Sequence, residues 1–534
     1  MNAATSAPAQ KFGRLRSLFC PVQKSEFKLF IPLLLIFFFI CFNYNILRPA
    51  KESLVVTAPG AGAEILPFLK VWAVLPMALA MSLLFTKLAN RFSIEKVFYI
   101  MMSIFVGFFV LFATVLYPLR EYIHPYAWAN SMEAVLPLGL KGLIAIIRHW
   151  SYALFYVMAE LWNVSIMTVL FWGFANEVLN VGVAKRFYVL ILLGGNQSAI
   201  AAGGAIAFMS KMGLKWGAKL GTDPWQISLL ILTFFTLFSS GAAMIILRWL
   251  HKNVLHKREI HIEAKEKETK EEYQLGLRKN FQYLAKSRYL LLIATLVVAY
   301  NICINLTEVT WKSQLGQIHT DPSHFQAYMG KVTLWVGIIA TFISILSATL
   351  LRQFSWTVNA LIPPIILVIT GAGFFSFLLC KNSTLGMALA GFLGSTPLVL
   401  GTFFGSLQNC FSRASKYTIF DATKELVFIP LSRESKLKGK AAIDGVGSRL
   451  GKSGSSLLYQ ALLLSLGTVD MTLPYVALIF LIVTVLWIVA VCSLGKEFNL
   501  LVEKQEKEQI LKKQVLEKEE MEPVTSTSSS EALV

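Results

Sequence analysis

Charged side chains inside long apolar stretches are the residues of this chain that could do chemistry. Glu160 lies within the apolar stretch 142–176, and no cation lies three or four residues away from it. A charge at the centre of a membrane helix costs about 2.5–3.5 kcal/mol on insertion scales, so each one needs a reason. Two interpretations of Glu160 remain open: it handles a substrate or a proton, or it forms a structural ion pair with a distant residue.

Basic residues near the ends of other apolar stretches could bind an anion. Lys51 and Arg48 follow the asparagine-rich end of the first stretch, and Lys424 follows the tenth. Plainer interpretations also stand: Lys51 reaching the membrane surface with its head group, and Lys424 belonging to a solvated helix end. Glu308 has Lys312 four residues later, the orientation of a helical ion pair that contributes about 0.2–0.5 kcal/mol.

The segment 438–454, KGKAAIDGVGSRLGKSG, resembles a phosphate-binding P-loop, but that motif requires glycine where this chain has Val446. No strand is predicted before it and an apolar stretch follows it, so we do not predict an ATPase. Arg449 and Lys452 still lie where a helix begins, and free backbone N–H groups there favour anions. Membrane topology alone would also place positive charge at this position.

The composition is typical of a membrane protein. Of the 534 residues, 55% are hydrophobic and 15% are charged, whereas soluble globular proteins have about 25% charged residues. The six cysteines form no CxxC pair, and no histidine has a carboxylate four residues away. We therefore predict neither a metal site nor a cofactor.

About twelve apolar stretches are each near the ~20 residues that cross a hydrocarbon core. They lie at 28–47, 65–86, 97–117, 142–176, 187–210, 226–248, 289–308, 328–350, 357–380, 386–410, 454–470 and 473–494. The fold class predicted is therefore an all-α polytopic membrane protein. An even number of crossings puts both termini on one side, where most of the 49 lysine and arginine residues also fall. The positive-inside rule then places both termini in the cytoplasm. The net charge of +18 reflects this topology, and we predict no nucleic-acid partner.

Two of these apolar regions, 136–178 and 386–428, are too long for one straight crossing. About 40 helical residues would measure roughly 60 Å, twice the thickness of the hydrocarbon core. Each region is therefore expected to bend, to lie partly in the membrane interface or to project into the cytoplasm. Arg148-His149 and Ser395-Thr396-Pro397 are the expected break points.

The chain also repeats itself at about half its length. FNYNILRPAKESLVV (42–56) is echoed by YNICINLTEVTWK (300–312), and TKLANRFS (86–93) by ATLLRQFS (348–355). The pattern predicts two six-helix halves of the major facilitator type, with a substrate site between them. The organisation predicted is a cytoplasmic N-terminus at 1–27, a first bundle at 28–249, a basic linker at 250–288, a second bundle at 289–496 and a charged, partly disordered cytoplasmic tail at 497–534.

Seven motifs, in order along the chain, carry a resemblance to a known family. They are FNYNILRPAKESLVV (42–56), APGAGAE (58–64), AELWNVS (159–165), WGFANE (172–177) with AKRFY (184–188), NICINLTEVTWKSQL (301–315), SKYTIFDATKEL (415–426) and KGKAAIDGVGSRLGKSG (438–454). Together they resemble the nucleotide transporter family of plastids and obligate intracellular bacteria, also called the ATP/ADP translocase family, and its chlamydial type in particular.

The resemblance implies a transporter in the lipid bilayer of a bacterial inner membrane. We expect a monomer, because nothing in the sequence demands more. It would import host nucleoside phosphates (ATP, other nucleoside triphosphates, ADP) by alternating access, driven by protons or a counter-nucleotide. Functional roles are implied for Lys51, Glu160, Glu308 and Lys424, with Arg48, Asn176, Arg449 and Lys452 as further substrate-binding residues. In the expected mechanism, Lys51 and Lys424 clamp the phosphates, and the two glutamates hold these lysines while the site is empty.

One motif departs from the family pattern. The family's ATP/ADP exchangers look like R-D-x-K-D at the end of the first helix, where this chain reads Arg48-Pro49-Ala50-Lys51-Glu52. This departure favours a broad-range, proton-coupled nucleotide importer. A strict ATP/ADP antiporter and a major facilitator carrier of another organic anion remain as alternatives. A membrane enzyme is not predicted, because it would need a catalytic histidine or closely spaced carboxylates.

Overall fold

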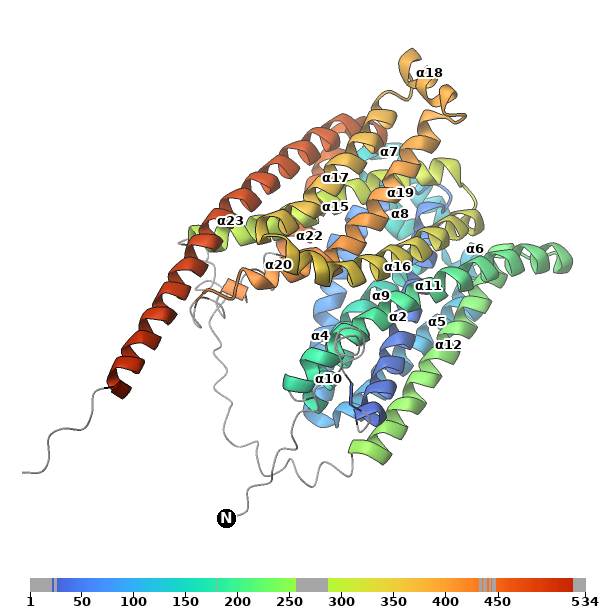
Figure 1. Cartoon of the computed structure of the whole chain (residues 1–534). Helices are drawn as coiled ribbons and strands as arrows, with labels where there is room; N and C mark the ends of the chain where they lie inside the picture. The colour runs from blue at the N-terminus through green and yellow to red at the C-terminus, as the bar shows by residue number, and fades with distance from the viewer. Residues whose placement is uncertain are drawn as a thin grey trace, which may run out of the picture.

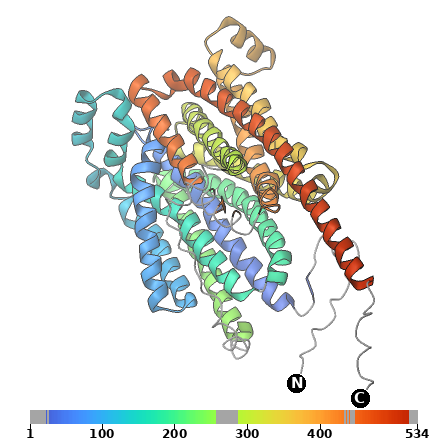
Figure 2. The ribbon, with the colours of Figure 1, turned by 90° about the vertical axis from the view of Figure 1, so that its left-hand side faces the viewer.

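The computed structural model describes residues 22–23, 26–179, 181–255, 287–431, 435, 439–440, 443 and 448–521, and nearly all of these are helical. Most of the predicted N-terminal segment and basic linker, the end of the tail and much of the 438–454 segment lie outside the described residues. Two bundles lie side by side in both views, the first in blue and green and the second in yellow to red (Figures 1 and 2).

The first half consists of α2 (Phe27–Val56), α3 (Ile65–Phe68) continued by η2 (Leu69–Val74) and α4 (Leu75–Arg91), α5 (Ile94–Leu111) with η3 (Phe112–Leu116), the short elements α6 (Arg120–Ile123), α7 (Tyr126–Val135), η4 (Leu138–Leu140) and α8 (Lys141–Arg148), then α9 (Trp150–Leu161) with η5 (Trp162–Phe171) and α10 (Trp172–Val178), α11 (Val181–Leu220), and α12 (Pro224–Leu250) with η6 (His251–Leu255).

The second half consists of α15 (Arg288–Ile318), α16 (Pro322–Gln353), α17 (Trp356–Leu379), α18 (Thr384–Phe392), α19 (Pro397–Ser415) continued by η7 (Lys416–Phe420) and α20 (Asp421–Leu426), α22 (Ser448–Leu466), and α23 (Val469–Met521). The segments η2, η3, η5, η6 and η7 are π-helical. Such wide turns are frequent at functional sites.

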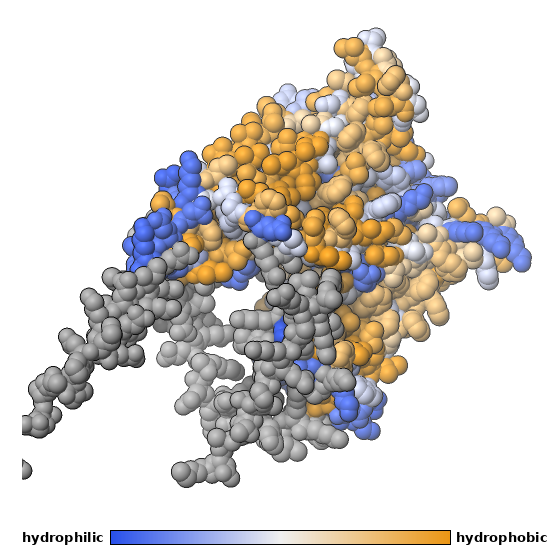
Figure 3. Space-filling view, viewed as in Figure 1, coloured by the Kyte–Doolittle hydropathy of each residue, from blue (hydrophilic) through white to orange (hydrophobic). Residues whose placement is uncertain are grey.

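Within the described residues, 10 helices are long and apolar enough to cross a membrane, or up to 11 if one bent pair is counted as a single crossing. The remaining predicted crossing corresponds to α22, a 19-residue helix that carries Lys452, Ser455, Ser456 and Gln460. Its polar residues lower its mean hydropathy. Apolar side chains cover most of the visible face of the helices (Figure 3), as expected for a protein surrounded by lipid.

The helices of the two overlong apolar regions are interrupted at the expected places. In the first, α8 ends at Arg148 and α9 begins at Trp150. In the second, α18 ends at Phe392 and α19 begins at Pro397, with an angle of 71° between the two helices. Thr396 caps the second helix by accepting a hydrogen bond from the Val399 amide. Proline at a first helical position and a side-chain cap are both typical of a new helix start, so this prediction is confirmed.

Close packing of α11 against α16 joins the two halves. The helices lie next to each other in Figure 1, and glycines permit the contact: a Cβ on Gly203 would lie 2.5 Å from Cβ of Leu334 and 2.9 Å from its Cα. Gly330 and Gly337 face Ile206 and Ile200 of α11 in the same way. Small residues of this kind let membrane helices approach closely.

We expect Gly203→Ala to destabilise the protein by about 1–3 kcal/mol, because the added methyl group overpacks the contact between α11 and α16. Gly204→Ala is the matched control, since a Cβ there meets nothing within 4 Å. Alanine should be neutral or mildly stabilising at that control position. Thermal unfolding of both purified variants checks this, and equal melting temperatures would contradict it.

Candidate functional site

Helices α2 and α15 occupy equivalent places in the two halves. Asn45 of α2 donates a hydrogen bond to Ser198 of α11 (3.1 Å), and Asn305 of α15 donates one to Ser455 of α22 (2.9 Å). The same contact therefore recurs in each half, with the asparagines 260 residues apart and the serines 257. An interval of 260 residues also separates Arg48 from Glu308.

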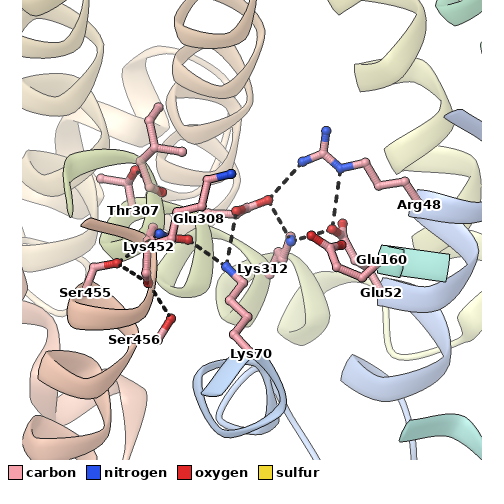
Figure 4. Close-up of polar contacts among 12 residues, drawn as sticks. Arg48, Glu52, Lys70, Glu160, Thr307, Glu308, Lys312, Lys452, Ser455 and Ser456 are labelled. Carbon is pink, nitrogen blue, oxygen red and sulfur yellow. Dashed lines mark hydrogen bonds and ion pairs between the residues drawn. The ribbon is translucent and has the colours of Figure 1, made fainter. Parts of the chain in front are cut away.

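Four charged residues at this interval form a closed ring between the halves, which we call the charge ring. Arg48 and Glu52 belong to α2, and Glu308 and Lys312 belong to α15. Lys312 Nζ lies 2.7 Å from Glu52 and 2.8 Å from Glu308. Arg48 lies 3.1 Å from Glu308 and 3.7 Å from Glu52. Equivalent positions carry opposite charges, so the two halves attract each other here (Figure 4).

Glu308 also accepts cations from outside the ring. Arg413 of α19 lies 2.8 Å from its Oε1 atom, and Lys70 of η2 lies 3.7 Å from its Oε2 atom. Lys70 donates a further hydrogen bond to the Asn305 side chain at 2.7 Å. Four cations, contributed by both halves, thus surround the Glu308 carboxylate, and Figure 4 shows Lys70 reaching toward it from its own helix.

The second ion pair joins Lys51 of α2 to Glu160 of α9. Lys51 donates a hydrogen bond to the Glu160 carboxylate and lies 4.1 Å above the ring centre of Tyr156. Its side chain is 2% exposed, so Lys51 does not reach toward the membrane surface. Glu160 therefore has a distant partner, and its 29% exposed side chain leaves a role in substrate or proton handling open.

This site carries an excess of positive charge. Among the described residues, its ion pairs involve five cations and three carboxylates. The cations are Arg48, Lys51, Lys70, Lys312 and Arg413, and the carboxylates are Glu52, Glu160 and Glu308. Because unpaired charge is costly away from water, the excess favours binding of an anion with several negative charges.

Lys424 lies in a separate pocket. Its described ion pair is with Glu425 at 3.6 Å. We expected Glu308 to hold Lys424, but the Glu308 carboxylate instead contacts Arg48, Lys312 and Arg413. The pocket has a volume of about 210 Å³, and its lining is Val297, Tyr300, Asn301, Lys416, Phe420, Asp421 and Lys424. Asn301 is seven residues before Glu308 on α15, a rise of about 10 Å along the helix.

The remaining predicted site residues lie away from the charge ring or outside the described side chains. Asn176 is exposed and accepts a hydrogen bond from the hydroxyl group of Tyr188. Lys452 is exposed, and its described contacts run through its carbonyl oxygen, which accepts from Ser455 and Ser456 at 2.9 and 3.1 Å. The side chain of Arg449 lies outside the described residues.

Sequence reasoning did not single out Lys70 and Arg413. Lys70 is a lysine inside the predicted crossing 65–86, so the cost of burying charge, applied to Glu160, would have indicated it as well. Arg413 lies beyond the predicted crossing 386–410 but within the longer apolar region 386–428, so the same argument would have indicated it as well. The continuation of α19 to Ser415 places it inside the bundle.

Comparisons with known proteins agree with this geometry. The family model described as "TLC ATP/ADP transporter" matches residues 5–498. "ADP,ATP carrier protein 1" of Chlamydia pneumoniae is 42% identical over 497 residues, covering 92% of this chain and 96% of that protein. "ADP,ATP carrier protein 1, chloroplastic" of Arabidopsis thaliana is 41% identical over 507 residues, covering 95% of this chain and 78% of that protein.

Solved structures show the same fold at low sequence identity. A mutant of the nucleoside transporter NupG aligns with a TM-score of 0.51 at 14% identity, covering 88% of this chain and 99% of that one. An inward-facing bacterial homologue of the iron transporter ferroportin aligns with a TM-score of 0.53 at 14% identity, covering 89% of this chain and 100% of that one. The predicted all-α, major-facilitator-like fold is confirmed.

We expect Lys312→Met to destabilise the protein by about 1.5–3 kcal/mol, because it removes the contacts of the Lys312 ammonium group with the carboxylates of Glu52 and Glu308, which keep their other cations. The side chain of Lys312 is 1% exposed. Lys507→Met is the control, since that lysine pairs with Glu503 at 2.6 Å but is exposed. Thermal unfolding should show a lower melting temperature for the first variant alone. Equal melting temperatures would contradict a structural role for the charge ring.

Proposed function

Because the chain belongs to the TLC ATP/ADP transporter family, we propose that it is a secondary active transporter of nucleotides, chiefly nucleoside triphosphates. The observation that carries this proposal is the excess of cations around Glu308 between the two halves. A nucleoside triphosphate carries about four negative charges, which could not be buried without such cations. In major facilitator transporters the substrate site lies at the interface of the halves.

The charge ring provides the conformational element that transport requires. It holds α2 to α15, and beside it the Ser53 hydroxyl donates to the carbonyl oxygen of Pro322 at 2.5 Å. A phosphate group that competes with Glu308 for its cations weakens the ring and shifts the balance between the closed and open arrangements of this end. The substrate thus biases a two-state element, which is the basis of alternating access.

We place the protein in the inner membrane of an intracellular bacterium, with both termini in the cytoplasm and import of host nucleotides as its task. The distribution of lysine and arginine supports this orientation. In this orientation, the ends of α2 and α15 that carry the charge ring lie toward the outside of the cell. The pocket at Lys416 and Lys424 lies toward the cytoplasm.

Two coupling modes fit this site. The relatives are named ADP,ATP carriers, which supports exchange of ATP for ADP. The Arg48-Pro49-Ala50-Lys51-Glu52 motif supports a broader substrate range with proton coupling, and Glu160 could then carry the proton. A carrier of another polyvalent organic anion would use the same cations, and competition by unlabelled nucleotides distinguishes it.

Uptake of labelled ATP, GTP, CTP and UTP into cells expressing the chain tests the proposal. We expect saturable uptake of ATP that unlabelled nucleotides compete away. Preloaded ADP should stimulate uptake if the coupling is exchange, whereas an uncoupler should abolish it if the coupling is to protons. Uptake no greater than that of cells lacking the chain would contradict nucleotide transport.

We further expect Lys51→Ala to abolish uptake while membrane insertion stays normal. The substitution leaves the Glu160 carboxylate without its described partner, and Arg48 and Lys70 also contribute to the positive potential at Glu160. The unpaired carboxylate would draw these cations away from the substrate and repel its phosphates. Lys507→Ala serves as the control for expression and insertion. Transport by Lys51→Ala at the wild-type rate would be incompatible with this role.

A further inference from the structure

We infer that Arg48, Lys70 and Arg413 form the binding site for the phosphate chain, and that Glu308 occupies the place of a phosphate group when no substrate is bound. The inference rests on the proposed function and deepens it by assigning Lys70 and Arg413 as substrate ligands. It also gives Glu308 the role of an internal competitor of the substrate.

The geometry around Glu308 is that of an anion site. Its Oε1 atom receives Arg48 at 3.1 Å and Arg413 at 2.8 Å, and Lys70 lies 3.7 Å from Oε2. Guanidinium groups match the oxygens of carboxylates and phosphates equally well, and lysine adds a compact charge. A phosphate group that replaced the carboxylate would therefore meet suitable donors already in place.

Accessibility separates these three cations from the other two. The side chains of Arg48, Lys70 and Arg413 are 20%, 21% and 14% exposed. By contrast, those of Lys312 and Lys51 are 1% and 2% exposed. An incoming anion can reach the first three cations. In contrast, Glu52 and Glu308 enclose Lys312. Glu160 and Tyr156 enclose Lys51. Lys312 and Lys51 are positioning residues in this arrangement.

Both halves contribute to the site and fix its shape. Arg48 and Lys70 belong to the first half, and Arg413 belongs to the second. Lys70 lies in the π-helical turn η2, and its ammonium group is held by Asn305 of the second half at 2.7 Å. Asn305 also donates to Ser455 of α22, which fixes it within the second half. If the halves separated, Lys70 would therefore move away from both Asn305 and Glu308. The three ligands converge only while the halves are in contact.

The first test measures binding of ATP, ADP and AMP to the purified full chain in lipid nanodiscs. Lys70→Gln and Arg413→Gln should each weaken ATP binding about tenfold or more, because a hydrogen bond to a charged group is lost. AMP binding should weaken less than ATP binding, so the ratio of the affinity for ATP to the affinity for AMP should fall. Lys381→Gln is the matched control, since that lysine pairs with Asp470 at 3.0 Å outside the charge ring.

The outcomes separate this inference from the proposed function. Absence of ATP binding by the wild-type chain would overturn the proposed function itself. Wild-type binding by both glutamine variants, or an equal loss of ATP and AMP binding together with a lower melting temperature, would overturn the assignment of Lys70 and Arg413. Lys70→Arg should retain much of the ATP affinity, because the charge remains within reach of the phosphates.

A second test concerns Glu308 as the competitor. Glu308→Gln removes the negative charge and keeps the shape, so it should bind ATP about tenfold more tightly than the wild-type chain while its transport rate falls. Because tighter binding stabilises the folded state more, adding ATP should also raise the melting temperature of Glu308→Gln more than that of the wild-type chain. Weaker ATP binding by Glu308→Gln would overturn the competitor role.

Discussion

The structure depends on one electrostatic constraint: five cations and three carboxylates are gathered in the ion pairs of the site between two apolar bundles. Charges removed from water must be paired, and here the pairing is incomplete by two positive charges. Glu308 reduces the excess by accepting four cations at once. Under the function that we propose, an anionic substrate completes the neutralisation that the protein's own carboxylates begin, and its binding is thereby linked to conformational change.

Internal duplication explains how such a site can be built. The equivalent helices α2 and α15 meet between the halves, and identical charges there would repel each other. The chain instead carries Arg48 and Glu52 in one copy and Glu308 and Lys312 in the other, so each residue faces an opposite charge. The contacts of Asn45 and Asn305 with Ser198 and Ser455 keep the two copies in equivalent settings. Electrostatic attraction between the halves thus follows from the opposite charges at equivalent positions.

Much of the fold followed from the sequence, because lipid restricts a spanning segment to a long apolar helix. The breaks near Arg148 and Pro397 were also predictable, since helix length is limited by membrane thickness. The site was only partly predictable. The pair of Glu308 with Lys312 is local and was visible in the spacing, but the contacts of Glu160 with Lys51 and of Lys70 with Glu308 join helices distant in the chain. Lys424 was expected beside Lys51, and its place in a separate pocket depends on how α19 continues through η7 into α20.

The most direct measurement of the central claim is an experimental structure of the full chain with ATP bound. Our account predicts phosphate oxygens within hydrogen-bond distance of Arg48, Lys70 and Arg413, with the Glu308 carboxylate turned away from Arg413. A nucleotide whose phosphates lie elsewhere, with every ion pair of Glu308 intact, would contradict it.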